Sequence, residues 1–244
     1  KIHVSGKENM PKGAAVIVAN HPSLLDAVFL IKGLDDKIIF YAKKKNYNAI
    51  WSWPMRFIGE YIFHQEIVPA DKKFGNAALS HHVIKRLSKK LSQEKIVGFF
   101  PEGGRSKNFR EVGKSFRPGA AYIAYINKVP LVPIALYETD EIWSRNKPGP
   151  NKGEVFIRVG KPLKLEEITK EEIKSTAGLK EEIELKVGSK LENLRLEQHS
   201  SDIFYKELKE RVDILNTVSK YRVVELFEKA KSDYEMSKQE KIIN

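Results

Sequence analysis

A histidine and an aspartate stand five positions apart in the segment Asn20–Asp26 (NHPSLLD), directly after an apolar run. Pro22 disfavours helical geometry at His21 and suits the first turn of a helix. We therefore expect His21 on a strand-to-helix loop and Asp26 one turn inside the helix. Within a regular helix this spacing would turn the two side chains about 140° apart, so His21 must fold back toward Asp26. A carboxylate that holds one ring nitrogen of a histidine makes the other nitrogen a tuned general base.

The same segment has a second interpretation without chemistry. Asn20 is a residue type that caps helices, His21 would then be incidental, and Asp26 would be solvated. Residues Asn20–Asp26 alone leave both interpretations open.

A glycine-containing loop, Pro101–Ser106 (PEGGRS), follows a second apolar run. Gly103 and Gly104 allow the backbone to turn sharply and to approach a ligand closely. Arg105 carries a planar fork that suits a phosphate group. Four more cationic residues follow, at Lys107, Arg110, Lys114 and Arg117, before Pro118 opens a helix whose amides and dipole favour anions. A plain turn beside a solvated basic loop is the alternative interpretation.

These two segments need a scaffold, and the apolar runs predict one. Strands are predicted over Ala14–Ala19, Lys37–Tyr41, Tyr61–Val68, Ile96–Phe100, Leu131–Leu136 and Glu154–Val159. Between them, a leucine and valine stripe at Leu79, Val83, Leu87 and Leu91 predicts an amphipathic helix. Alternating strands and helices indicate an α/β domain on a mostly parallel or mixed sheet, which we place over residues 1–165.

The C-terminal third has a different pattern. One apolar stripe runs over Leu179–Leu194 and another over Phe204–Leu215, with Ser200–Asp202 as an N-cap candidate between them. We predict a helical appendage over residues 166–244 that packs on the core or on a second subunit, which would make a homodimer.

Composition limits the classes of function. The chain has no cysteine, so disulfides and thiolate chemistry are excluded. No stretch reaches 18 consecutive apolar residues, so no membrane span is expected. Residues 1–162 carry 27 Lys and Arg against 14 Asp and Glu, and this surplus indicates an anionic partner. Nucleic acid is disfavoured because no recognition motif is present. His81 and His82 lie on a basic helix and are interpreted as surface residues, so no metal site is expected.

Together these residues resemble the glycerolipid acyltransferase family typified by lysophosphatidic acid (1-acylglycerol-3-phosphate) acyltransferase. The family's His-x4-Asp signature is similar to His21 and Asp26, and its Pro-Glu-Gly-Thr-Arg-Ser signature is similar to Pro101–Ser106, with Gly104 in place of threonine. Its apolar signature around a proline resembles Val129–Ile134 (VPLVPI). The resemblance covers about residues 5–165 and departs from the family at Gln65, where an arginine that holds the acceptor phosphate is expected.

The resemblance implies a function. The acyl donor would be acyl-CoA or acyl carrier protein, with no other cofactor, and the acceptor would be a lysophospholipid at the cytoplasmic face of an anionic membrane. His21 and Asp26 would be catalytic. Substrate-binding roles would fall to Glu102, Gly103, Gly104, Arg105, Ser106, Lys107 and Arg117. A hydrolase that uses the same pair on water, and a non-catalytic domain that binds anionic lipid, are the alternatives.

Overall fold

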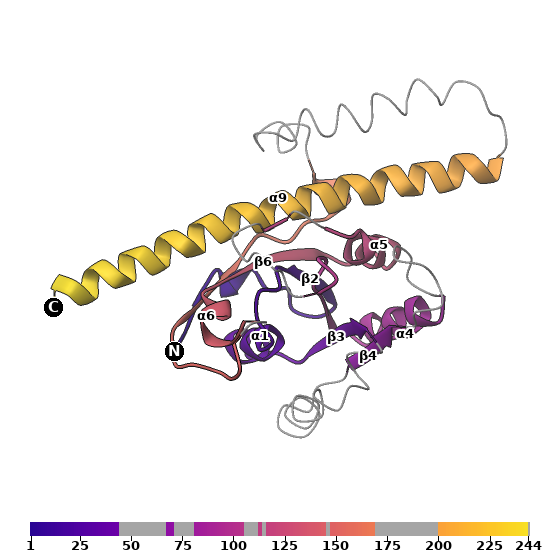
Figure 1. Cartoon of the computed structure of the whole chain (residues 1–244). Helices are drawn as coiled ribbons and strands as arrows, with labels where there is room; N and C mark the ends of the chain where they lie inside the picture. Colours follow the sequence, from indigo (N-terminus) through magenta and orange to yellow (C-terminus); the bar gives the residue numbers. More distant parts are fainter. Residues whose placement is uncertain are drawn as a thin grey trace.

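The computed structural model describes residues 1–43, 67–70, 81–104, 112–113, 116–144, 147–168 and 200–243. A sheet lies at its centre (Figure 1). It has seven strands in the order β1-β7-β6-β2-β5-β3-β4. Its strands are β1 (Ile2–Ser5), β2 (Ala15–Ala19), β3 (Ile38–Lys43), β4 (Ile67–Ala70), β5 (Ile96–Phe99), β6 (Leu131–Tyr137) and β7 (Val155–Val159). Every pair is parallel except β6 with β7. The predicted α/β class with a mixed sheet is therefore confirmed.

Strand β2 shows why this sequence forms a central strand. All five of its residues are buried, and it pairs with β5 on one side and β6 on the other. A continuous apolar run is typical of a strand that is covered on both faces, because side chains alternate between the faces. Ala15 and Ile17 belong to one core cluster, and Val16 and Val18 belong to the other.

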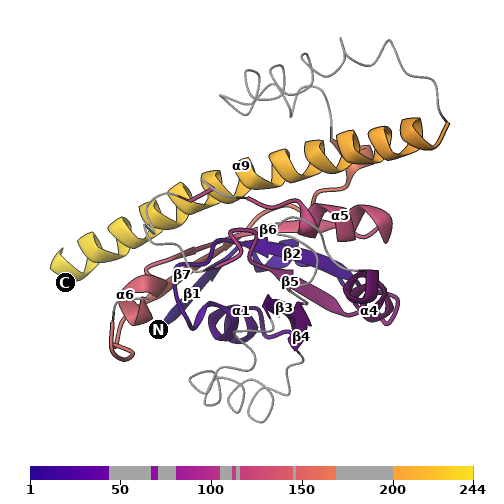
Figure 2. The ribbon, with the colours of Figure 1, turned by 45° about the vertical axis from the view of Figure 1, so that its right-hand side comes forward.

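Helices cover both faces of the sheet, as Figure 2 shows. Helix α1 (Asp26–Leu34) buries Leu30 and Leu34 against the face that carries Ile17. On the opposite face lie α4 (His81–Leu91), α5 (Gly119–Ile126) and α9 (Ser200–Ile243), which share a core with Val16 and Val18. The short helix α6 (Thr139–Trp143) follows β6, and the 3₁₀ turns η1 (Lys7–Asn9) and η4 (Leu165–Glu167) complete the described elements.

The amphipathic pattern of α4 is as predicted, since Val83, Leu87 and Leu91 are its buried residues and both histidines are exposed. Leu79, the first residue of the predicted stripe, lies outside the described residues, as does the stripe over Leu179–Leu194.

Helix α9 runs along β6 and β7 and ends beyond the edge of the sheet (Figures 1 and 2). Val212, Leu215, Val218 and Val223 are buried in the core that it shares with α5, and Phe227 packs with Ala135 of β6. The guanidinium of Arg158 on β7 donates two hydrogen bonds to the Asp233 carboxylate, at 2.6 and 2.7 Å. Extensive apolar burial thus fixes the middle of this helix on the sheet. No helix in the described ranges is long and apolar enough to cross a membrane.

Candidate active site

Three loops leave the same edge of the sheet, because β5, β2 and β6 are adjacent and parallel. Asn20 follows the end of β2, Phe100 follows β5, and Glu138 follows β6. In open α/β sheets ligands bind at the carboxyl ends of the strands. The sheet therefore brings Asn20–Asp26 and Pro101–Gly104, which lie about 80 residues apart, to one place.

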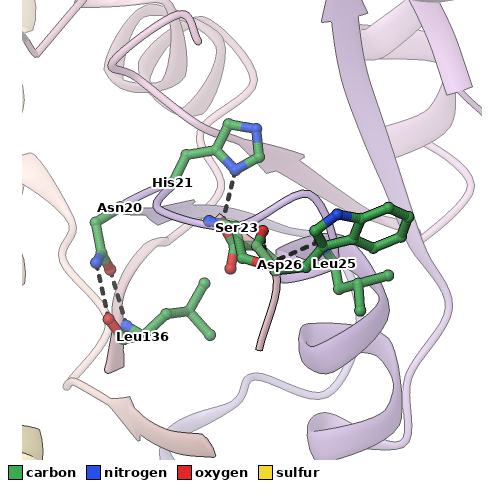
Figure 3. Close-up of polar contacts among 7 residues, drawn as sticks. Asn20, His21, Ser23, Leu25, Asp26 and Leu136 are labelled. Atoms are coloured by element: carbon green, nitrogen blue, oxygen red, sulfur yellow. Dashed lines mark hydrogen bonds and ion pairs between the residues drawn. The ribbon is translucent and has the colours of Figure 1, made fainter. Parts of the chain in front are cut away.

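Asn20 is bound to β6 and is not a helix cap. Its side-chain amide donates to the carbonyl oxygen of Leu136 at 2.8 Å, and its carbonyl oxygen accepts the Leu136 N–H at 2.8 Å (Figure 3). The side chain is 1% exposed. Asn20 thereby extends the pairing of β2 and β6 and fixes the backbone from which His21 leaves.

His21 and Asp26 meet as predicted. His21 Nδ1 lies 2.7 Å from Asp26 Oδ2, and Asp26 is fully buried while the His21 side chain is 19% exposed. The same carboxylate oxygen accepts the Ser23 N–H at 2.8 Å. An ionised carboxylate only accepts hydrogen bonds, so Nδ1 carries the proton and a neutral ring leaves Nε2 as the acceptor. Nε2 is on the side of the ring that faces away from Asp26 (Figure 3).

The predicted start of the helix is wrong. Asp26 is the first residue of α1 and not one turn inside it. Residues 23–25 form a turn instead, because the Asp26 carboxylate takes the Ser23 N–H, and the Ser23 hydroxyl accepts the Leu25 N–H at 3.2 Å. This turn is tied to α6, since the carbonyl oxygen of Trp143 accepts the Leu24 N–H at 3.2 Å and the Ser23 hydroxyl at 3.0 Å.

Phe100, in the loop that follows β5, packs on the ring of His21. The two rings stack with centroids 4.1 Å apart and planes 15° from parallel, and Phe40 of β3 stacks on Phe100 in turn. Residues 99 and 100 are both phenylalanine in the sequence, but only the structure shows that Phe100 contacts the histidine. The imidazole is thus restrained by a hydrogen bond at one edge and an aromatic surface on one face.

Glu102 lies beside this pair. Burial is the main reason that the pKa of its carboxyl is raised from 4.5 to about 7. The nearby Asp26 charge raises the pKa further, and a hydrogen bond from the His21 backbone lowers it. Near neutral pH the carboxyl is therefore protonated in a large fraction of molecules. Perturbed carboxyls of this kind cluster at functional sites.

Arg117 packs on the glycine loop. Gly103 has a φ of 71°, and a Cβ atom built there would lie 2.7 Å from the Arg117 Cζ. The backbone N–H of Arg117 also donates to the Pro101 carbonyl oxygen at 3.0 Å. Glycine is favoured at position 103 by the left-handed backbone, and a larger residue there would also displace the Arg117 guanidinium from its place over the loop.

The remaining predicted site residues are placed as follows. Gly104 is exposed, and a Cβ there would touch nothing within 4 Å. Arg105, Ser106 and Lys107 lie outside the described residues, and so does Gln65. In the described part of the chain, His, Asp and Glu side chains form no group of three that could hold a metal ion.

Comparison with known proteins places the chain among related sequences. A model of the acyltransferase family matches residues 1–137. The 1-acyl-sn-glycerol-3-phosphate acyltransferase of Saccharomyces cerevisiae is 28% identical over 173 residues, which are 70% of this chain and 54% of the relative. The chloroplastic LPAT1 enzyme of the same name from Arabidopsis thaliana is 33% identical over 67% of this chain and 44% of its own length.

The match extends over a larger share of a bacterial relative's length. The 1-acyl-sn-glycerol-3-phosphate acyltransferase of Bacillus subtilis is 31% identical over 66% of this chain and 73% of its own length. The crystal structure of the Thermotoga maritima 1-acyl-sn-glycerophosphate acyltransferase, PlsC, matches 80% of this chain and 73% of that one, at 25% identity and a TM-score of 0.49. The chain spans about half the length of the yeast and Arabidopsis relatives. From the family match and the Bacillus relative, this chain belongs to the acyltransferase family that includes the 1-acyl-sn-glycerol-3-phosphate acyltransferases.

Proposed function

We propose that the chain transfers a fatty acyl group from acyl-CoA or acyl carrier protein to the hydroxyl of a lysophosphatidic acid-like glycerolipid. The observation that carries the proposal is the 2.7 Å contact between His21 Nδ1 and the fully buried Asp26. This contact fixes the tautomer in which Nε2 accepts a proton.

His21 Nε2 takes the proton of the acceptor hydroxyl as the oxygen attacks the thioester carbonyl carbon. A tetrahedral oxyanion forms, the C–S bond breaks, and the imidazolium returns the proton to the leaving thiolate. The products are an ester and a free thiol. No protein nucleophile is needed, because the acceptor supplies the attacking oxygen.

The oxyanion needs hydrogen-bond donors, and most amides near His21 are already used. The N–H groups of Ser23, Leu24 and Leu25 donate within the loop or to Trp143, and the Gly103 N–H donates to the Phe100 carbonyl at 3.0 Å. The N–H of Gly104, in the exposed part of the same loop, is the donor that we assign to the oxyanion.

The acceptor phosphate is assigned to the Pro101–Ser106 loop with Arg117. Arginine binds a phosphate through paired hydrogen bonds, and Arg117 is the cation of this group whose position is described. Glu102 fits beside an anion because its raised pKa, about 7, leaves much of the carboxyl neutral near that pH. Arg105, Ser106 and Lys107 are assigned to the same group on the sequence alone.

Two further assignments complete the proposal. The basic residues 1–162 favour an anionic membrane surface as the place where donor and lipid acceptor meet, and phospholipid biosynthesis is the process served. We also propose that residues 1–165 form the catalytic unit and residues 166–244 an attached helical part.

One assay tests the reaction. The purified chain is incubated with labelled acyl-CoA or acyl carrier protein and with lysophosphatidic acid, other lysophospholipids, glycerol 3-phosphate or no acceptor, and thiol release and labelled product are followed. The proposal predicts acceptor-dependent release of thiol and formation of acylated lipid. Release at the same rate without an acceptor would establish a hydrolase, and absence of release would leave only a binding function.

A further inference from the structure

Helix α9 makes a polar contact with the loop that leads into Arg117. The Asn216 Nδ2 donates a hydrogen bond to the backbone carbonyl oxygen of Phe116 at 3.2 Å, across 100 residues of sequence. The other side-chain atom, Asn216 Oδ1, is fully buried and has no hydrogen-bond partner among the residues described. A buried amide that leaves its oxygen unpaired carries a desolvation cost. Among the described residues, the Asn216 side chain therefore makes its hydrogen bond to the loop through the amide donor alone.

The same helix contacts the loop at two more points. Gly113, with a φ of 85°, lies so close to α9 that a Cβ atom there would be 3.0 Å from the Val224 Cγ2. Val112 packs against the cluster that contains Leu226 and Phe227. These contacts, together with the hydrogen bond from Asn216, hold Val112, Gly113 and Phe116 against the helix.

A short path connects this hydrogen bond to the candidate phosphate site. Phe116 is followed directly by Arg117, whose N–H donates to the Pro101 carbonyl oxygen at 3.0 Å. The Arg117 guanidinium lies over Gly103, within 3.0 Å of where a Cβ would be. Moving the Phe116 carbonyl would therefore move the start of the Arg117 side chain relative to the glycine loop.

We infer that α9 is a positioning element for acceptor binding, with Asn216 as the positioning residue that sets Arg117 over Gly103. The inference rests on the proposed function, because it assigns Arg117 to the acceptor phosphate. Helix α9 lies outside residues 1–137, which match the acyltransferase family. This part of the chain would thus tune affinity for a phosphate-bearing acceptor without contacting the reacting atoms.

The test compares Asn216→Leu with Thr217→Val, a neighbour on α9 whose hydroxyl donates to the Asp213 carbonyl of its own helix at 2.7 Å. Asn216→Leu should raise the KM for 1-acylglycerol 3-phosphate about fivefold, because that factor corresponds to the free energy of one hydrogen bond. The kcat should stay within about twofold of the wild-type value. Thr217→Val should leave both unchanged. A lowered kcat with an unchanged KM, or equal effects in both variants, would overturn the inference. If the leucine variant does not fold, the same KM measurement is made on Asn216→Asp, which keeps the shape of the side chain and loses the donor. An unchanged KM in that variant would also overturn the inference.

A binding measurement separates this inference from the proposed function. The dissociation constant for inorganic phosphate is measured by calorimetric titration of wild type, Asn216→Leu and Arg117→Gln. Weaker binding in both variants, by about fivefold in Asn216→Leu, supports the positioning role even if the wild-type chain transfers no acyl group. Binding that is unaffected by Asn216→Leu, or by Arg117→Gln, contradicts it.

Discussion

The side chain of Asn20 pairs with both backbone polar groups of Leu136, at 2.8 Å in each direction. This pairing joins the residue before the candidate base to a strand 116 positions away. It makes the position of His21 depend on the β2–β6 contact.

Asn20→Ala removes both hydrogen bonds and leaves the Leu136 N–H and carbonyl oxygen buried without partners. We expect the free energy of unfolding to fall by about 2–6 kcal/mol, because two buried groups are orphaned and each costs about 1–3 kcal/mol. Urea denaturation followed by circular dichroism measures the change. Asn127→Ala is the matched control, since among the described residues its side chain donates to the Ile123 carbonyl at a helix end. It should cost no more than about 1 kcal/mol. Equal losses in the two variants would contradict the role of Asn20.

The ion pair of Arg158 and Asp233 provides a second prediction, on the attachment of α9. Asp233→Asn weakens a bidentate pair whose side chains are 31% and 18% exposed, and should lower the free energy of unfolding by about 1–3 kcal/mol. Glu225→Gln on the same helix is the control, because Glu225 is more exposed, at 39%, and should lose less than about 1 kcal/mol. If Glu225→Gln lowered the free energy of unfolding more than Asp233→Asn in the same urea titration, the Arg158–Asp233 pair would not be what holds α9 on the sheet.

Glu102 predicts a pH dependence of stability. Its pKa is raised from 4.5 to about 7 in the folded chain, so the folded state binds the proton more tightly than the unfolded state. The stability that this provides is present below pH 4.5 and is lost as the pH rises toward 7. Burial also raises the pKa of Glu138 and of Asp140, so the wild type is compared with Glu102→Gln. The glutamine variant should lose less stability between pH 4.5 and 7, and parallel curves for the two proteins would show that Glu102 is not the group responsible.

Phe100 predicts an effect on turnover through the orientation of the histidine ring. Phe100→Leu keeps an apolar side chain but removes the surface on which His21 stacks at 4.1 Å. We expect kcat to fall about tenfold, since small misplacements of a catalytic group are costly. Phe40→Leu is the control, because Phe40 contacts Phe100 and is not stacked on the histidine. Steady-state kinetics would contradict the proposed role of Phe100 if the Phe40 variant had the larger effect.

Much of this scaffold could be predicted from sequence, for a physical reason. The runs that form β2, β5 and β6 are apolar without interruption and are followed by loop residues, which is how strands covered on both faces appear in a sequence. Strand β1, Ile2–Ser5, was not predicted, because four residues of mixed polarity at a sheet edge give no distinctive pattern. Helix α6 was missed as well, since it is five residues long.

The candidate site was predictable in its residue types and less so in its contacts. The spacing of His21 and Asp26 indicated that they could meet, and they do. The pairing of Asn20 with Leu136 depends on strand order, and the raised pKa of Glu102 depends on burial by distant segments, so neither could be derived from local sequence. Arg117 was named as one of several loop cations, and only the fold shows that it packs on Gly103.

The most direct test of the proposed catalysis is kcat for acyl transfer by His21→Ala, measured with saturating acyl donor and 1-acylglycerol 3-phosphate. His82→Ala, on the exposed face of α4, serves as the control for histidine replacement. General-base catalysis contributes about 10²–10⁴, so kcat of the His21 variant should fall by at least about a hundredfold while the control stays at the wild-type value. A His21→Ala protein that is folded and keeps kcat within about tenfold of wild type would contradict the assignment of His21 as the base.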